Sequence, residues 1–232
     1  MTNKILIKNA LIIDPLENKE IREDVRIEGE EIVERGASLK HAPTDEELID
    51  ANGCWLCPGL IDMHTHLRDL GQKDKEDIHT GTKAAAAGGF TTVVSMANTD
   101  PVLDNGATLS LYLQKIKARA VVEVLPVASV TKGLLGHELS NMLELSELGA
   151  IAFSDDGKPV QNMTVLRRAL EYARLTGKII ISHAEDLDLS EGGSIHECEL
   201  STSLGLQGIS YASETVAVAR ELEIVRLTGP AY

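Results

Sequence analysis

The segment LCPGLIDMHTHLR, residues 56–68, joins an apolar run to two histidines and an arginine. Side chains on an extended strand alternate between its two faces, so His64 and His66 point the same way. Arg68 follows with the same parity. Two imidazole nitrogens can therefore reach one metal ion, with a fixed positive charge beside it for an anionic group. The pattern predicts half of a metal-dependent site.

From Trp55 onward, short apolar runs alternate with amphipathic stretches. The runs that predict strands are 60–63, 91–96, 121–127, 150–153 and 179–182. Helices are expected between them, for example over 82–87 and 164–175. The second of these helices has an apolar stripe and is followed by Gly177, a residue that often ends a helix. This alternation predicts an α/β fold with a parallel sheet.

Polar residues follow the predicted strands at their carboxyl ends. They are His64, His66, Asn98, Asp155, Asp156 and His183. Reactive groups from several strands converge in this way in a (β/α)8 barrel. A doubly wound sheet would more often have a glycine-rich phosphate loop after its first strand, and none is seen. Imidazole and carboxylate ligands together suit zinc, which can activate water.

Five strands precede the end of the chain, whereas a closed barrel of this kind has eight. We therefore expect an incomplete TIM-like (β/α)8 metal-dependent hydrolase barrel over residues 55–232. Open sheet edges and an unfinished apolar interior predict aggregation, segment swapping or a need for a C-terminal half.

The residues before this barrel have a different pattern. Short β-type runs at 5–7, 10–13 and 25–27 are separated by charged, turn-forming stretches such as 14–18. They predict a small β-sandwich-type domain over residues 1–54.

Composition excludes several classes of partner. A formal net charge of −14 opposes binding to nucleic acid or to an anionic membrane surface. Three cysteines are too few and too unevenly spaced for a disulfide framework. The sequence has no signal peptide and no apolar stretch of about 18 residues, so we expect a cytoplasmic protein.

Several segments together resemble the dihydroorotases of the amidohydrolase superfamily. They are residues 58–69, 75–78, 87–93, 96–99, 153–160, 183–186 and 199–201. The resemblance implies a zinc enzyme that interconverts dihydroorotate and N-carbamoyl-aspartate in de novo pyrimidine biosynthesis. It also implies that the family's catalytic aspartate and a further histidine ligand lie beyond Tyr232. We therefore expect a truncated chain with no catalytic residue of its own.

The resemblance also implies the metal ligands. Two zinc ions are expected, the first held by His64 and His66 and the second partly by His183. Asp156 would bridge them, in place of the carboxylated lysine of many relatives. Asp155 is the alternative bridge, and strand alternation disfavours an arrangement in which both aspartates face one metal.

The substrate-binding residues implied by the resemblance are His66, Arg68 and Asn98. Arginine suits a substrate carboxylate because its planar guanidinium donates two parallel hydrogen bonds, and asparagine adds a neutral donor. By contrast, His79, His137 and His196 are expected to be solvated or capping residues.

Two alternatives stay open. One is another cyclic amidohydrolase, such as an allantoinase or hydantoinase, although these normally use the carboxylated lysine. The other is a non-catalytic, dihydroorotase-like partner of aspartate transcarbamoylase, against which the intact His64, His66 and Arg68 argue. A homodimer is also considered. Measuring both the zinc content of the protein and its cyclisation of carbamoyl-aspartate separates these cases.

Overall fold

The computed structural model describes residues 4–229, and the chain divides into two compact units between Gly59 and Leu60. The sequence placed this boundary a few residues earlier, after Cys54. The two units are described separately below.

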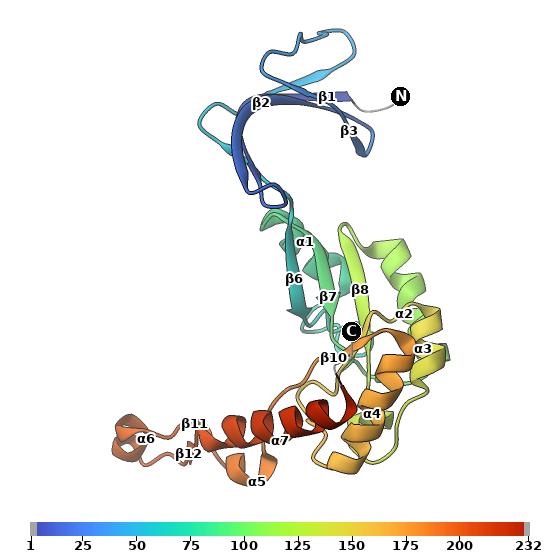
Figure 1. The fold of residues 1–232 in the computed structure, drawn as a ribbon, viewed down its shortest axis with the longest axis vertical. Helices are drawn as coiled ribbons and strands as arrows, with labels where there is room; N and C mark the ends of the chain where they lie inside the picture. Colours follow the sequence, from blue (N-terminus) through green and yellow to red (C-terminus); the bar gives the residue numbers. More distant parts are fainter. Residues whose placement is uncertain (1–3, 230–232) are drawn as a thin grey trace. The chain divides into compact units, whose positions relative to one another are not determined.

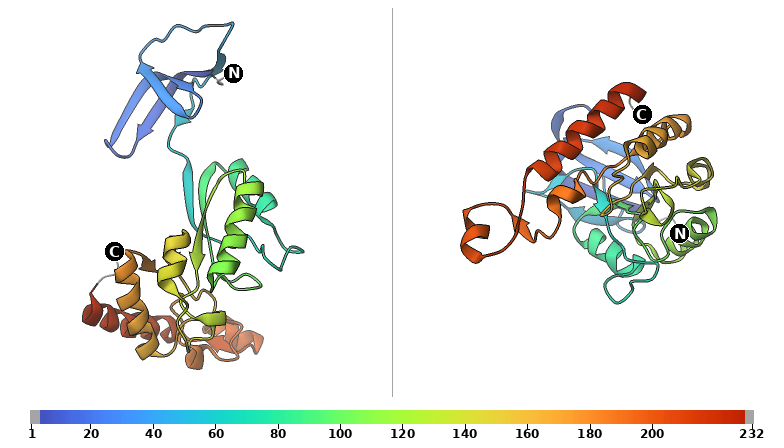
Figure 2. Two further views of the ribbon diagram at one scale, coloured as in Figure 1. Left: turned by 90° about the vertical axis from the view of Figure 1, so that its right-hand side faces the viewer. Right: turned by 90° about the horizontal axis from the view of Figure 1, so that it is seen from below.

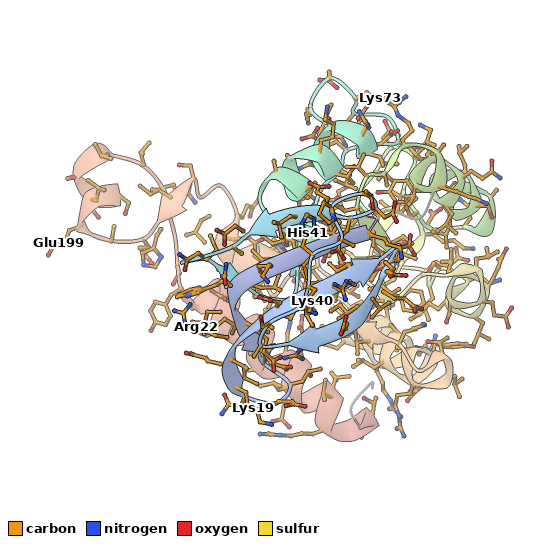
Figure 3. The ribbon with its side chains drawn as sticks, turned by 90° about the horizontal axis from the view of Figure 1, so that it is seen from above. Lys19, Arg22, Lys40, His41, Lys73 and Glu199 are labelled. Carbon is orange, nitrogen blue, oxygen red and sulfur yellow. The ribbon has the colours of Figure 1, made fainter. Side chains whose placement is uncertain are left out.

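The first unit is a five-stranded sheet. Its strands are β1 (Lys4–Asp14), β2 (Lys19–Glu28), β3 (Glu31–Gly36), β4 (Glu47–Asp50) and β5 (Trp55–Leu56). Strands β1, β2 and β3 pair antiparallel in chain order, while β4 and β5 run parallel to β1. The apolar runs expected at 5–7 and 10–13 form one strand with an irregularity between Ile7 and Ala10. Figure 3 shows the exposed basic side chains of Lys19, Arg22 and Lys40 on this unit.

The second unit is built on a parallel sheet of five strands in the order β10-β9-β8-β7-β6. These are β6 (Leu60–Thr65), β7 (Phe90–Ser95), β8 (Glu123–Ala128), β9 (Ala152–Phe153) and β10 (Ile179–Ile180). Successive strands along the chain are neighbours in the sheet, as in a barrel (Figure 1). The five strands expected from the sequence are thus confirmed.

Helices connect the strands of this sheet. They are α1 (Ile78–Ala87), α2 (Gly106–Arg119), α3 (Met142–Leu148) and α4 (Met163–Thr176), with a short 3-10 turn η1 (Lys132–Leu134). Helix α4 begins after Asn162, whose side chain accepts hydrogen bonds from two backbone amides, and ends at Gly177 with φ of 66°. Phe153 of β9 and Leu170 of α4 belong to the main core cluster.

The remaining segment follows β10 and carries four short elements and one long helix. They are α5 (Leu187–Ser190), β11 (Ile195–His196), α6 (Glu199–Leu204), β12 (Gly208–Ile209) and α7 (Ala212–Thr228). Strands β11 and β12 pair with each other, and Figure 2 shows them with α6 beyond one end of α7. Among residues 4–229, no helix combines the length and the apolar character needed to cross a membrane.

Candidate metal centre

Strand β6 carries the two histidines of the opening segment to the carboxyl end of the sheet. His64 lies on the strand and His66 directly follows it. Their ring centroids are 5.2 Å apart in an edge-to-face arrangement. The predicted common orientation of the two imidazoles agrees with this separation.

Asp156, three residues after β9 ends at Phe153, is the centre of the cluster that these histidines join. Its carboxylate is 3.4 Å from His64 Nε2 and 3.4 Å from His66 Nε2. His183, which follows β10, brings Nδ1 to 3.3 Å from the same carboxylate. Asp156 is 6% exposed, so three partly exposed imidazoles surround one buried acid.

The donor set fits a metal ion. One ligand atom from each of His64, His66 and Asp156 lies within 4.8 Å of the others, and among the described residues this is the one such group of histidine, cysteine or acid side chains. Zinc bonds of about 2.1 Å in tetrahedral geometry place neighbouring ligand atoms roughly 3.4 Å apart. The nitrogen–oxygen distances around Asp156 have this size. Three protein ligands would leave a fourth position open.

Asp155 has a different environment from its neighbour. Its carboxylate accepts hydrogen bonds from the backbone amides of Val130 (2.8 Å) and Thr131 (3.0 Å) and from the Thr131 hydroxyl. Burial raises its pKa, although these hydrogen bonds oppose the shift. Asp155 therefore fastens the end of β9 to the loop after β8.

Asn98, in the loop after β7, contacts two members of the cluster. Its Oδ1 is 3.0 Å from His66 Nδ1, and its Nδ2 donates to Asp156 Oδ2 at 3.2 Å. A proton on His66 Nδ1 is consistent with this contact and leaves the Nε2 lone pair facing Asp156. Arg68 lies in the loop after β6 with a left-handed φ of 56°.

Glu185 is a member of the cluster to which sequence reasoning gave no role. Its Oε2 is 3.2 Å from His183 Nε2, on the ring edge opposite to Asp156. The signal available in the sequence is the two-residue spacing of His183 and Glu185 in an extended segment. By contrast, His79 hydrogen-bonds the backbone carbonyl of Arg119, outside the cluster.

A parallel sheet with histidines and an acid gathered at the carboxyl ends of its strands is typical of one class of protein, the metal-dependent hydrolases with an α/β barrel fold. The fold is similar to that of L-hydantoinase from Arthrobacter aurescens, with a TM-score of 0.78 and 18% identity over 99% of this chain and 52% of that one. It is also similar to dihydropyrimidinase from Brevibacillus agri, with a TM-score of 0.74 and 26% identity over 98% and 50% of the two chains.

Relatives that match in sequence assign the chain to one family within this class. A family model described as dihydro-orotase-like matches residues 53–232. Proteins named dihydroorotase from Geotalea daltonii and Pelotomaculum thermopropionicum are 50% and 46% identical to this chain, each over 97% of it. The chain belongs to the dihydroorotase-like family. It covers 53% and 52% of those two relatives, so it spans about half the length of the proteins it matches.

Proposed function

We propose that this chain supplies metal ligands and a substrate-carboxylate site to a dihydroorotase, which reversibly hydrolyses dihydroorotate to N-carbamoyl-aspartate in pyrimidine biosynthesis. The observation that carries the proposal is the convergence of three imidazoles on Asp156 at the carboxyl ends of parallel strands. The relatives named dihydroorotase favour this substrate over those of the hydantoinases.

The metal in this proposal is zinc, with two ions in the complete site. His64 and His66 would hold the first ion, His183 would contribute to the second, and Asp156 would bridge them. Zinc supplies polarisation of a carbonyl oxygen and activation of water for hydrolysis. Glu185 beside His183 and Asn98 beside His66 would orient these imidazoles, as hydrogen-bond partners of metal-bound histidines commonly do.

The substrate carboxylate is assigned to Arg68 and Asn98, with His66 also beside the substrate. A guanidinium can bind a carboxylate through two parallel hydrogen bonds, and an amide can add one more. We assign no proton-transferring residue within residues 4–229. A homodimer and an association with aspartate transcarbamoylase remain predictions.

Zinc content and ligand turnover test the proposal. The purified protein, loaded with zinc and freed of excess metal, is expected to retain zinc by elemental analysis, and His64→Ala and Asp156→Ala are expected to lose it. His196→Ala, an exposed histidine on β11, is the matched control and should retain zinc.

Cyclisation of N-carbamoyl-L-aspartate is then measured in the zinc-loaded protein. Zinc retention without turnover is the expected result, because no proton-transferring residue is assigned within residues 4–229. Turnover that disappears in His64→Ala but not in His196→Ala would show instead that this chain is active by itself. Failure of the unmodified protein to retain zinc would contradict the metal site itself.

A further inference from the structure

Asp69, which directly follows Arg68, is a completely buried carboxylate. Its Oδ1 is 2.7 Å from Nζ of Lys115, a residue of helix α2 that lies 46 positions further along the chain. The Lys115 side chain is 27% exposed, so Asp69 is the buried member of the pair, and its carboxylate would be costly to leave without a partner. The loop after β6 is thereby tied to α2.

A layer of buried polar groups surrounds this ion pair. Asp69 Oδ2, the Tyr112 hydroxyl and the Ser95 hydroxyl have no hydrogen-bond partner within the described part of the chain. Tyr112 lies one helical turn before Lys115, on the same side of α2. Burial raises the pKa of Tyr112 to about 12, and the Asp69 charge acts in the same direction. Tyr112 also packs in one buried cluster with Leu67 and Leu70, which flank Asp69 in the loop.

The backbone at Arg68 needs such support. A φ of 56° is uncommon for a residue with a side chain, and it persists where surrounding contacts impose it. The Asp69 amide donates to the Leu67 carbonyl at 2.7 Å, and the Gln72 amide donates to the Arg68 carbonyl at 3.0 Å. Asp69 is thus the anchored residue of a tight turn that also contains Arg68.

The same turn is packed against the loop that carries Asn98. The Asp100 amide donates to the Leu70 carbonyl at 2.9 Å. A Cβ added at Gly71, where φ is 89°, would lie 2.1 Å from the Asp100 carbonyl oxygen. Two backbones in such close contact shift together, so an anchor on one loop also positions the other.

We propose that Asp69 and Lys115 are positioning residues for carboxylate recognition, because the ion pair between buried Asp69 and Lys115 sets the orientation of Arg68 and the placement of the Asn98 loop. This inference rests on the proposed function, in which Arg68 and Asn98 bind the substrate carboxylate. It assigns the pair no contact with the substrate.

The test compares two ligands that differ by one carboxylate. Calorimetry measures binding of N-carbamoyl-L-aspartate and of N-carbamoyl-β-alanine, which lacks the α-carboxylate, to the zinc-loaded protein. Lys115→Met is expected to weaken binding of the first ligand by about 10- to 100-fold, because a misplacement near 1 Å has effects of that size. Binding of the second ligand and the zinc content should not change.

Matched variants accompany this measurement. Lys115→Arg keeps the positive charge and should retain most of the affinity for N-carbamoyl-L-aspartate. Lys117→Met removes an exposed lysine from the same helix and should bind both ligands like the unmodified protein. Lys115→Gln, which keeps a hydrogen-bond donor, replaces Lys115→Met if that variant does not fold.

The outcomes separate the two proposals. Unchanged binding of N-carbamoyl-L-aspartate by Lys115→Met overturns the inference and leaves the proposed function standing. An equal loss for both ligands also overturns it, since that result indicates general damage. If the unmodified protein binds neither ligand, or does not distinguish them, the proposed carboxylate site is wrong and the inference falls with it.

Discussion

At the level of single residues, two adjacent aspartates have opposite surroundings. Asp156 faces three imidazoles, whereas Asp155 accepts hydrogen bonds from the backbone of the loop after β8. Asp155 directly precedes a turn in which the Lys158 amide donates to the Asp155 carbonyl, and Asp156 lies within that turn. Asp156 is therefore available to a metal, whereas the Asp155 carboxylate is occupied by hydrogen bonds to Val130 and Thr131.

Asparagine substitutions distinguish these two roles. Asp156→Asn is expected to lower the affinity for Co²⁺, followed by its visible absorption, by at least about 10-fold, because the negative ligand is lost. Asp155→Asn can still accept the two backbone hydrogen bonds, so its Co²⁺ affinity should stay close to that of the unmodified protein. The opposite ranking would identify Asp155 as the ligand.

A buried acid in the first unit gives a prediction for pH dependence. Asp24 accepts hydrogen bonds from the amides of Asn9 (3.0 Å) and Leu39 (2.9 Å) and pairs with Lys8 at 3.2 Å. Burial alone would raise its pKa, but these contacts outweigh it and hold the pKa below 3.8. The ionised carboxylate therefore stabilises the fold above its unfolded pKa near 3.8, and this stabilisation is lost as the pH falls through the lower folded pKa.

Asp24→Asn should lower the free energy of unfolding at pH 7 by about 2 kcal/mol, because charge-assisted hydrogen bonds are weakened. The difference from the unmodified protein should shrink when urea unfolding, followed by circular dichroism, is repeated near pH 3. Asp45→Asn, at an exposed position, is the control and should be neutral at both pH values. A difference that does not depend on pH would argue against the charge.

At the level of secondary-structure elements, helix α4 shows how the sequence pattern becomes packing. Its apolar stripe, predicted from spacing, is buried on one face, whereas Leu175 on the same helix is 74% exposed. The stripe packs in the same cluster as Phe153 of β9, the strand that leads to Asp156. The core that holds α4 therefore also supports the metal cluster.

Removing a large side chain from this core should lower the free energy of unfolding by a predictable amount. Phe153→Ala should lower the free energy of unfolding by about 3–5 kcal/mol, since it removes a completely buried ring and leaves a cavity. Leu175→Ala is the matched control on α4 and should change stability by no more than about 0.5 kcal/mol. Thermal unfolding measures both, and equal stability of the two variants would contradict the packing described.

At the level of the whole molecule, β6 lies at one end of the parallel sheet. Its apolar residues Ile61 and Met63 are 61% and 74% exposed. Among residues 4–229, no further strand pairs with the outer edge of β6. An exposed apolar edge strand favours association with other chains.

Self-association through this edge is therefore expected. The apparent mass in size-exclusion chromatography with light scattering should rise with protein concentration, and Ile61→Lys should reduce that rise because a charge disfavours edge pairing. Leu111→Lys, at an exposed position on α2, is the control and should not reduce it. A single mass at all concentrations would contradict the prediction.

Sequence reasoning predicted the elements of the second unit better than the contacts within its site. The five parallel strands and the family are confirmed. The structure brings together all four predicted metal ligands, and it adds Glu185 beside His183. The spacing of His183 and Glu185 is a weak local signal, and the contact between Lys115 and Asp69, 46 positions apart, has no local signal at all.

The sequence by itself determined the class of fold and the shared orientation of His64 and His66, because side-chain periodicity is a local property of the backbone. Only the tertiary structure decided that Asn98 bridges His66 and Asp156 and that Lys115 lies beneath Asp69. These partners are 32, 58 and 46 positions apart in the chain. Which faces meet across such separations depends on how strands and helices pack, and no local spacing encodes it.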